Sequence, residues 1–259
     1  GLGDVYKRQL YNICTVLQGG NLLNIIVLND QATIAQKAFE IVKDTLVTGQ
    51  ECFGLATGSS PQGLYKKLRE SDLDFSQATS INLDEYIGLP ANHPQSYAYF
   101  MQEELFKDKP FKQSFLPDGS NPNAEEEAQR YEAILAAHPI DLQILGIGNN
   151  GHIGFNEPGS SFKSRTRRVD LTPSTIQANQ RFFDSLDQVP SQAYSMGIQS
   201  ILEAKQILLI AFGPSKAEAI QASVEGPITE DLPASILQTH PNVTFLLDPA
   251  ASRLLQVDL

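Results

Sequence analysis

The chain has 259 residues, of which 41% are hydrophobic and 19% charged, an ordinary composition for a folded protein with a sizeable core. Its 30 acidic and 19 basic residues give a net charge of −11, which argues against general binding of nucleic acid or of an anionic membrane surface. Only two cysteines are present and they form no CxxC pair, so a reducing, cytoplasmic location is expected rather than a disulfide scaffold.

Residues 1–22 show no hydrophobic periodicity that indicates a packed element. They do not resemble a signal peptide, because no apolar segment follows the basic pair Lys7-Arg8. No part of the chain reaches the roughly 18 consecutive apolar residues that span a bilayer. We predict that residues 1–22 are an extension outside the domain, with a short helix as the alternative, and that residues 23–259 form a single domain.

Short apolar runs alternate with helical patterns along the rest of the chain. Strands are expected at residues 24–28, 50–56, 79–83, 141–147, 167–171, 206–212 and 243–247. Helices are expected after the N-cap Asp30 to about residue 48, and at 62–69, 97–106, 124–137, 172–179, 198–204 and 215–224. Strands buried on both sides and separated by helices predict an α/β fold: a doubly wound, mostly parallel, Rossmann-like sheet with helices on both faces.

Ligands of such sheets bind where the strands end, so the residues after each apolar run are the first candidates for a site. Thr57-Gly58-Ser59-Ser60-Pro61 follows the run at 50–56 and precedes a helix. Small residues and the free N–H groups of a helix N-terminus suit a phosphate. A plain strand-to-helix turn with Ser59 or Ser60 as the N-cap is an equally good interpretation of this segment alone.

Two acids follow the run at 79–83. Asp84 and Glu85 are adjacent, and neighbouring side chains of an extended backbone point to opposite sides, so at most one carboxylate faces a pocket directly. Acids at the end of a hydrophobic strand are costly unless they are solvated, paired or used. Taken alone, the pair is more typical of a helix cap or a salt bridge than of a catalytic group.

A glycine-rich loop follows the run at 141–147. Four glycines within residues 146–154 frame His152, and Glu157 comes five residues after the histidine. Because glycines allow unusual backbone angles, the loop can hold the imidazole and the carboxylate as an acid–base pair. The density of glycines favours this interpretation over a surface loop. The other three histidines form no ligand-spaced cluster with His152, so no metal site is expected.

Positive charge is concentrated between Lys163 and Arg181, where five cations stand against one acid, Asp170, a net charge of +4. Most of these side chains fit a solvated basic patch, and one or two of them can bind an anion bidentately. Lys216 follows the run at 206–212 at the start of a helix. Alone, it is more typical of a surface lysine than of a ligand-binding residue.

Five segments carry a more specific signal: LATGSSPQGLY (55–65), NLDEYIGLPANHPQSYAYFM (82–101), LGIGNNGHIGFNEPGSSFKSRTR (145–167), ANQRFF (178–183) and GPSKAEAIQASVEGP (213–227). Together they resemble the glucosamine-6-phosphate deaminase family, also called the isomerase/deaminase family. The order of strands and helices matches throughout. The segments NLDEYIGL and NGHIGFNEP, in this order and separation, make the resemblance specific.

The resemblance implies a reaction, without cofactor or metal, in which D-glucosamine 6-phosphate and water give D-fructose 6-phosphate and ammonia. Asp84 is implied as the base that moves a proton between C2 and C1. His152 is implied to open the sugar ring, supported by Glu157. The phosphate-binding residues implied are Thr57, Gly58, Ser59, Ser60, Arg181 and Lys216.

The chain departs from the family pattern at two places. Many relatives carry Asp at the position of Asn150, where it completes a triad with the histidine and the glutamate. Asn150 cannot ionise but can accept a hydrogen bond from the imidazole, so a working, differently tuned ring-opening step is expected. Arg167 and Ser160 fit the site at which allosteric hexameric relatives bind N-acetylglucosamine 6-phosphate, but Val169 stands where a Lys is expected. We therefore predict weak or absent allostery.

Two other functions are weighed against this one. A 6-phosphogluconolactonase-like hydrolase has a related fold and can also use a ring-opening histidine, but NLDEY and the loop length at 145–158 favour the deaminase. A non-catalytic sugar-phosphate sensor would bind without turnover, and the complete set of Asp84, His152 and Glu157 argues against it. The expected partner is a small sugar phosphate, with no nucleic acid and no membrane, for a monomer or a homo-oligomer. The segment after Glu157 to about residue 183 is a candidate lid.

Overall fold

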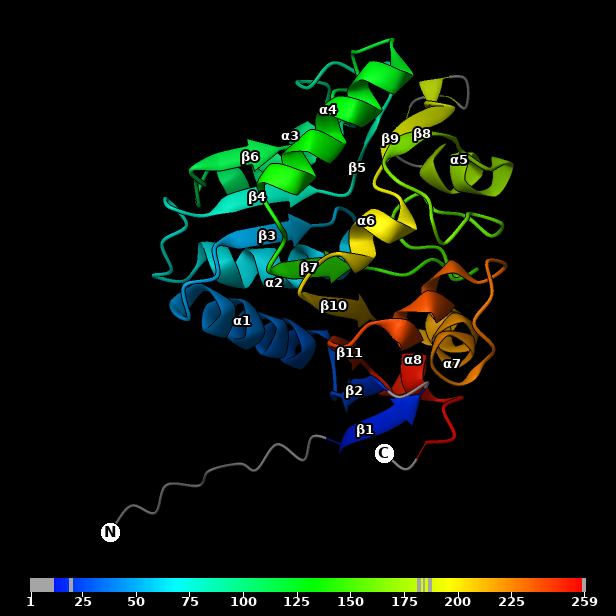
Figure 1. The fold of residues 1–259 in the computed structure, drawn as a ribbon. Coiled ribbons are helices and arrows are strands. Elements are labelled where there is room, and N and C mark those ends of the chain that lie inside the picture. The colour runs from blue at the N-terminus through cyan, green and yellow to red at the C-terminus, as the bar shows by residue number, and fades with distance from the viewer. Residues whose placement is uncertain (1–11, 19–20, 181–182, 184, 186–187, 258–259) are drawn as a thin grey trace.

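The computed structural model describes residues 12–18, 21–180, 183, 185 and 188–257 (Figure 1). Its strands are β1 (Asn12–Gln18), β2 (Asn21–Val27), β3 (Cys52–Leu55), β4 (Thr79–Asn82), β5 (Asp84–Tyr86), β6 (Gln113–Phe115), β7 (Leu142–Leu145), β8 (Arg167–Asp170), β9 (Gln192–Ser195), β10 (Gln206–Ala211) and β11 (Val243–Leu247). Its α-helices are α1 (Gln31–Val47), α2 (Ser59–Arg69), α3 (Tyr97–Met101), α4 (Ala124–Ala137), α5 (Pro173–Asn179), α6 (Ile198–Leu202), α7 (Ala217–Glu225) and α8 (Pro249–Ser252). A π-helix, η1 (Gln102–Phe106), continues α3, and two 3-10 helices are η4 (Pro214–Lys216) and η5 (Pro233–Thr239).

The main sheet has eight described strands, of which seven are parallel. The strand order is β1-β2-β11-β10-β7-β3-β4-β6, in which every pair from β2 to β6 is parallel and β1 is antiparallel to β2 at one edge. All seven strands expected from apolar runs occur, and β11 has the predicted bounds. The prediction of an α/β fold with a mostly parallel sheet is therefore confirmed.

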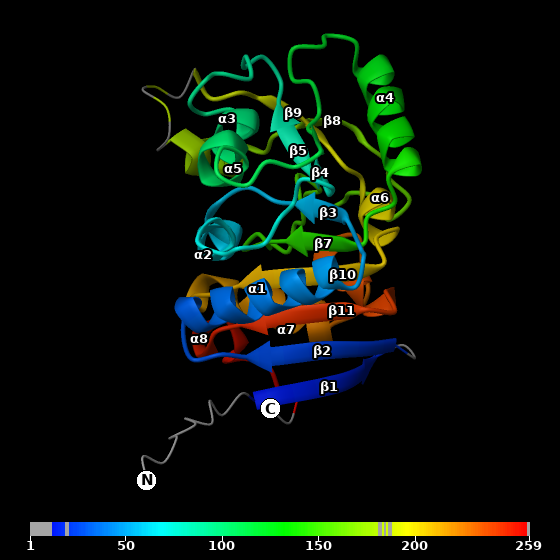
Figure 2. The same ribbon diagram turned by 90° about the vertical axis from the view of Figure 1, so that its left-hand side faces the viewer.

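Helices cover both faces of this sheet (Figures 1 and 2). Alternate side chains of β10 point to opposite faces: Ile207 and Leu209 pack in one buried cluster, and Leu208 and Ile210 in another. The first cluster includes side chains of α4, α6, α7 and α8, whereas the second includes side chains of α1, α2 and α3. The sheet is doubly wound, as predicted.

The helix termini follow their local sequence. Asp30 caps α1, because its Oδ1 accepts a hydrogen bond from Thr33 N at 2.8 Å while Thr33 Oγ1 accepts one from Asp30 N at 3.1 Å. This reciprocal pair is a capping box, and it confirms the predicted N-cap. Helix α4 has the predicted bounds, and Asn123 caps it through a hydrogen bond from Glu126 N.

A second, three-stranded antiparallel sheet with the order β5-β9-β8 lies beside the β4 end of the main sheet (Figure 2). Leu83 joins the two sheets, because its N–H donates to Leu55 O at 3.1 Å and its carbonyl accepts from Met196 N at 2.8 Å. Of this small sheet, the sequence predicted only β8. The chain thus leaves the main sheet and enters β5 within one residue, which fixes where Asp84 stands.

The main sheet begins before residue 23, because residues 12–18 form β1 and pair with β2 along its length. Residues 1–11 lie outside the described part of the chain. Among the described residues, no helix has the length and apolar character needed to cross a membrane.

Candidate active site

The carboxyl ends of β3, β4, β7 and β10 lie at one edge of the main sheet, because these neighbouring strands are parallel (Figure 1). The segments that leave these strands approach one another closely. A Cβ at Gly146, directly after β7, would lie 3.1 Å from Ser60 Oγ of α2. A Cβ at Gly154 would lie 3.6 Å from Asp84 Oδ2. The sheet therefore brings the serine-rich turn, the acid pair and the glycine-rich loop together.

Asp84 is a buried acid without a hydrogen-bond donor among the described residues. It opens β5 and is 6% exposed. Burial, with a smaller contribution from the charge of neighbouring Glu85, raises the pKa of Asp84 to about 8. An acid held this way at a sheet edge where ligands bind is a candidate catalytic base.

Glu85 instead accepts hydrogen bonds from the N-terminus of helix α3, where it acts in addition to the N-cap residue Ser96. Its carboxylate accepts hydrogen bonds from the backbone N–H groups of Tyr86 at 2.8 Å, Tyr97 at 3.0 Å and Ala98 at 2.8 Å. The last two groups belong to the first turn of α3, whose N–H groups have no partner within the helix. Burial still raises the pKa of Glu85, and these three hydrogen bonds oppose that shift. The two adjacent acids therefore have different roles.

His152, Asn150 and Glu157 form a hydrogen-bonded relay. Asn150 Oδ1 lies 2.8 Å from His152 Nδ1, and Asn150 Nδ2 donates to Glu157 Oε2 at 2.7 Å. The second contact orients the amide, so its oxygen faces the ring as an acceptor and Nδ1 is assigned the proton. Glu157 Oε2 lies farther from Nδ1, at 3.4 Å. This tautomer leaves Nε2 as the acceptor with which the ring can take a proton from a ligand.

Gly148 makes room for the imidazole of His152. A Cβ at Gly148 would come within 2.2 Å of ring atoms Nδ1 and Cε1. Gly151 adopts a φ of +83°, and Gly154 adopts a φ of +56°, in the left-handed region that glycine tolerates. The glycine density seen in the sequence therefore has a physical reason: the loop folds closely around the relay.

Glu157 is the anion of the relay. Burial raises its pKa, but hydrogen bonds from His152, Thr175 and Asn150 outweigh burial and lower the pKa of Glu157 to about 2. Its Oε1 accepts a hydrogen bond from Thr175 Oγ1 at 2.7 Å. Thr175 belongs to α5 and falls within the candidate lid, residues 158–183. No sequence pattern points to Thr175, because a threonine in the first turn of a helix is ordinary.

The turn at residues 57–61 presents the N-terminus of α2. Gly58 is the N-cap with a φ of +87°, Ser59 is the first helical residue and Pro61 the third. The interpretation of Ser59 or Ser60 as N-cap is wrong, because the left-handed glycine starts the helix one residue earlier. Gly58 has no side chain to cap the helix, so its first N–H groups remain available to an anion.

Lys216 stands at the end of η4 and is half-buried. Burial lowers the pKa of Lys216, and no acid among the described residues forms an ion pair with it. Phe212, four residues earlier, lines the same small cavity as Ser59 and Ser60, so the end of β10 adjoins the start of α2. Arg181, the other predicted phosphate-binding cation, lies outside the described residues.

The basic segment does not form a single anion site. Arg165 makes ion pairs with two acids. Arg167 donates to Asn156 Oδ1 at 2.8 Å and to Ser160 Oγ at 3.3 Å, and none of the described acids pairs with it. Burial lowers the pKa of Arg167. Arg167, Ser160 and Val169 line an open cavity of about 520 Å³.

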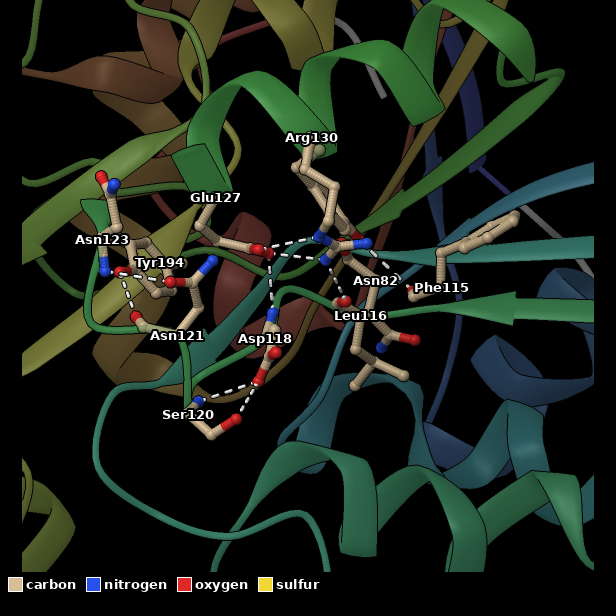
Figure 3. Close-up of polar contacts among 11 residues, drawn as sticks. Asn82, Phe115, Leu116, Asp118, Ser120, Asn121, Asn123, Glu127, Arg130 and Tyr194 are labelled. Atoms are coloured by element: carbon tan, nitrogen blue, oxygen red, sulfur yellow. Dashed lines mark hydrogen bonds and ion pairs between the residues drawn. The ribbon is translucent and has the colours of Figure 1, made fainter. Parts of the chain in front are cut away.

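The loop beside β5 is fixed from α4 (Figure 3). Glu127 is fully buried, and its carboxylate accepts hydrogen bonds from Asp118 N at 2.7 Å and from Arg130 Nε and Nη2 at 2.8 and 2.6 Å. Arg130 also donates to Leu116 O at 3.2 Å. One turn of α4 therefore holds both ends of the segment from residue 116 to 118.

The same loop rests directly on the strand that carries Asp84. A Cβ at Gly119 would lie 2.0 Å from Tyr86 O, so only glycine fits between the loop and β5. Tyr131 of α4 donates to Asn82 O at 2.5 Å, two residues before Asp84. The backbone on both sides of Asp84 is thus held in place by α4 and its preceding loop.

Comparison with known proteins gives a consistent family match. Residues 29–246 match the family described as glucosamine-6-phosphate isomerases/6-phosphogluconolactonase. Two similar curated relatives are the glucosamine-6-phosphate deaminases of Streptococcus pneumoniae strains Hungary19A-6 and ATCC BAA-334/TIGR4. They are 59% identical to this chain over 234 and 233 residues, which is 90% of this chain and 100% of each relative.

Solved structures show the same fold. A structure described as a monomeric glucosamine-6-phosphate deaminase matches with a TM-score of 0.85 and 43% identity, covering 89% of this chain and 99% of that chain. The 6-phosphogluconolactonase from Trypanosoma brucei matches with a TM-score of 0.75 and 19% identity, covering 88% of this chain and 97% of that chain. The second match is a likeness of fold alone.

Proposed function

Because the chain belongs to the family of glucosamine-6-phosphate isomerases and 6-phosphogluconolactonases, we propose that it is an isomerising deaminase of amino-sugar catabolism. It converts D-glucosamine 6-phosphate and water into D-fructose 6-phosphate and ammonia. The observation that carries this proposal is the buried carboxyl of Asp84, which has no hydrogen-bond or ion-pair partner among the described residues, beside the loop that holds His152. Such a pair supplies one base for proton transfer between carbons and one group for ring opening.

Ring opening comes first and uses the relay. His152 Nε2 takes the proton of the O1 hydroxyl as the bond between C1 and the ring oxygen breaks, and the imidazole returns that proton to the ring oxygen. Asn150 holds Nδ1 during both transfers. The charge of Glu157, hydrogen-bonded to Asn150, favours the transient imidazolium. The product of this step is the open-chain aldehyde.

Asp84 then moves one proton from C2 to C1. Removal of the C2 proton, with transfer of one proton from the cationic nitrogen to O1, gives a neutral enolamine, and return of the proton to C1 gives the protonated C2 imine of the ketose. Water adds to this imine and ammonia leaves, which yields D-fructose 6-phosphate. A carboxylate whose pKa is about 8 is a stronger base than an exposed aspartate, and the substrate's cationic nitrogen favours its ionised form.

The phosphate group is proposed to bind at the N-terminus of α2. The groups involved are Thr57, Gly58, Ser59 and Ser60, with Lys216 and Arg181 as cations. Support comes from the N–H groups after Gly58, which no side chain of the N-cap residue caps, and from the half-buried Lys216, which pairs with none of the described acids. Since the phosphate is remote from C1 and C2, its binding energy serves to position the reacting carbons.

Weak or absent activation by N-acetylglucosamine 6-phosphate is also proposed. Arg167 and Ser160 face the cavity beside β8, but Val169 adds no second cation there. Arg168 also lines that cavity, but so do the acids Glu157 and Asp170, so the charges of the two arginines facing a bound phosphate are offset. Adding N-acetylglucosamine 6-phosphate to the assay below tests this point.

The decisive experiment measures ammonia release from D-glucosamine 6-phosphate and, in parallel, acid release from 6-phosphogluconolactone. We expect ammonia from the first substrate and a loss of about 10²- to 10⁴-fold in kcat for Asp84→Asn. The exposed Asp72 provides the matched control Asp72→Asn, with unchanged kcat. Lactone hydrolysis or ligand binding without ammonia release would overturn the proposal. Exchange of the C2 proton with solvent that persists in Asp84→Asn would overturn the role of Asp84 alone.

A further inference from the structure

Resting on the proposed function, we propose that Thr175 is a positioning residue for ring opening. Its hydroxyl holds the carboxylate of Glu157 in the orientation in which Glu157 supports Asn150 and, through it, His152. Thr175 touches none of the reacting atoms in this scheme. It acts through Glu157, and it ties helix α5 to the relay.

The two oxygens of Glu157 have separate partners. Oε2 accepts from Asn150 Nδ2 at 2.7 Å, and Oε1 accepts from Thr175 Oγ1 at 2.7 Å. A carboxylate held through one oxygen can still rotate about its last side-chain bond, whereas a carboxylate held through both cannot. The Thr175 contact therefore fixes the plane of the carboxylate, and with it the direction in which the Asn150 amide presents its oxygen to His152.

The hydroxyl of Thr175 is itself oriented by its neighbour. Thr172 Oγ1 donates to Thr175 Oγ1 at 3.0 Å, so Thr175 uses a lone pair there and has its one proton left for Glu157. Thr172 is also the N-cap of α5, because its Oγ1 accepts from Thr175 N at 3.3 Å. The first turn of α5 and the relay thus share one hydrogen-bonded chain.

This chain couples the position of α5 to catalysis. If α5 moves away from the loop, Glu157 loses one of its two fixed contacts, and the Asn150 amide loses its firm support. Other titratable groups near Glu157 are His152, whose Nδ1 lies 3.4 Å from Oε2, and Arg167, Arg168 and Asp170, which line the same cavity. Arg167 is engaged by Asn156 and Ser160, so it does not replace Thr175 as the donor.

A double-mutant cycle tests the inference. Thr175→Val removes the hydroxyl and keeps the shape, and we expect kcat for ammonia release to fall about tenfold with KM within twofold. In a Glu157→Ala background the same change should alter kcat by less than twofold, because its target is gone. Thr175→Ser should restore kcat. Gln177→Ala, an exposed change on the same helix, is the control and should leave kcat unchanged.

A purely structural role for Thr175 would give the same loss of kcat in both backgrounds, and that result would overturn the inference. Wild-type kcat in Thr175→Val would overturn it as well. Amide hydrogen exchange in α5 measures the same double-mutant cycle without turnover. Exchange should be faster in each single variant than in the wild type, and no faster in the double variant than in the single variants. If the wild type releases no ammonia, the proposed function fails. The hydrogen-exchange cycle then still tests the contact between Thr175 and Glu157. Additive effects of the two substitutions on exchange would refute that contact.

Discussion

Asp84→Asn should make the protein more stable at alkaline pH while it removes activity. In the native state burial raises the pKa of Asp84 to about 8, whereas the ordinary pKa of an aspartate is 3.8. Between these two values the native state binds more protons at this site than the unfolded chain. The free energy of unfolding must therefore fall as pH rises from about 4 to 8, and the amide of the variant avoids that loss.

The size of the effect follows from the two pKa values. Each pKa unit corresponds to about 1.36 kcal/mol, so the charge of Asp84 costs the native state at most about 6 kcal/mol above pH 8. Because real protein interiors behave as if their dielectric constant were higher than that of dry protein, the realised difference is smaller, about 2–4 kcal/mol. Below pH 4 both states hold the proton, and the difference should vanish.

Urea unfolding at pH 4, 6, 8 and 9 measures this difference directly. Wild type and Asp84→Asn should have similar free energies of unfolding at pH 4, and the variant should be increasingly more stable up to pH 9. Asp72→Asn, at an exposed position, should show no such trend. A difference that does not change with pH, or a variant less stable than the wild type at pH 9, would refute the assignment of Asp84 as a buried acid without partners.

Three further outcomes are expected. The value of kcat/KM should rise with pH towards about 8, because the ionised form of Asp84 is the base; a pH–rate profile that falls over this range contradicts it. Gly119→Ala should lower both thermal stability and kcat, by about 3 kcal/mol in the free energy of unfolding, because its Cβ would meet Tyr86 O at 2.0 Å; wild-type values would show that the loop moves aside freely. Glu85→Ala should cost about 3 kcal/mol in urea unfolding, since three backbone N–H groups lose their acceptor; an unchanged midpoint would contradict the capping role.

The strands β2, β3, β4, β7, β10 and β11 of the main sheet could be predicted because they are largely buried and appear as apolar runs, whereas the edge strand β6, with its first two residues exposed, has no such signal. The small sheet could not be predicted. β5 consists of Asp84-Glu85-Tyr86 and β9 of residues 192–195, and neither contains an apolar run or a regular alternation. Their pairing is set by tertiary contacts, such as Met196 N to Leu83 O, that no local pattern encodes. β1 carried a local signal in Ile13, Thr15 and Val16, which was missed because the segment was assigned to an extension.

The location of the site was predictable for a similar reason, since parallel strands place their carboxyl ends at one edge. The roles of the two adjacent acids were not. Asp84 and Glu85 are adjacent acids that follow the same apolar run. They differ because the first N–H groups of α3, a dozen residues later, donate to Glu85 and not to Asp84. The contact of Thr175 could not be predicted either, because its partner Glu157 lies 18 residues away in the chain.

Asp84 stays buried because the backbone around it cannot relax. Leu83 is bonded to the main sheet through its N–H and to the small sheet through its carbonyl, and Gly119 packs on Tyr86 O from the other side. A shift of β5 that exposed Asp84 to water would break these contacts and those of Glu85 with α3. These main-chain contacts keep Asp84 buried although burial disfavours its ionised form. The change Asp84→Asn removes that free-energy cost and leaves the main-chain contacts intact.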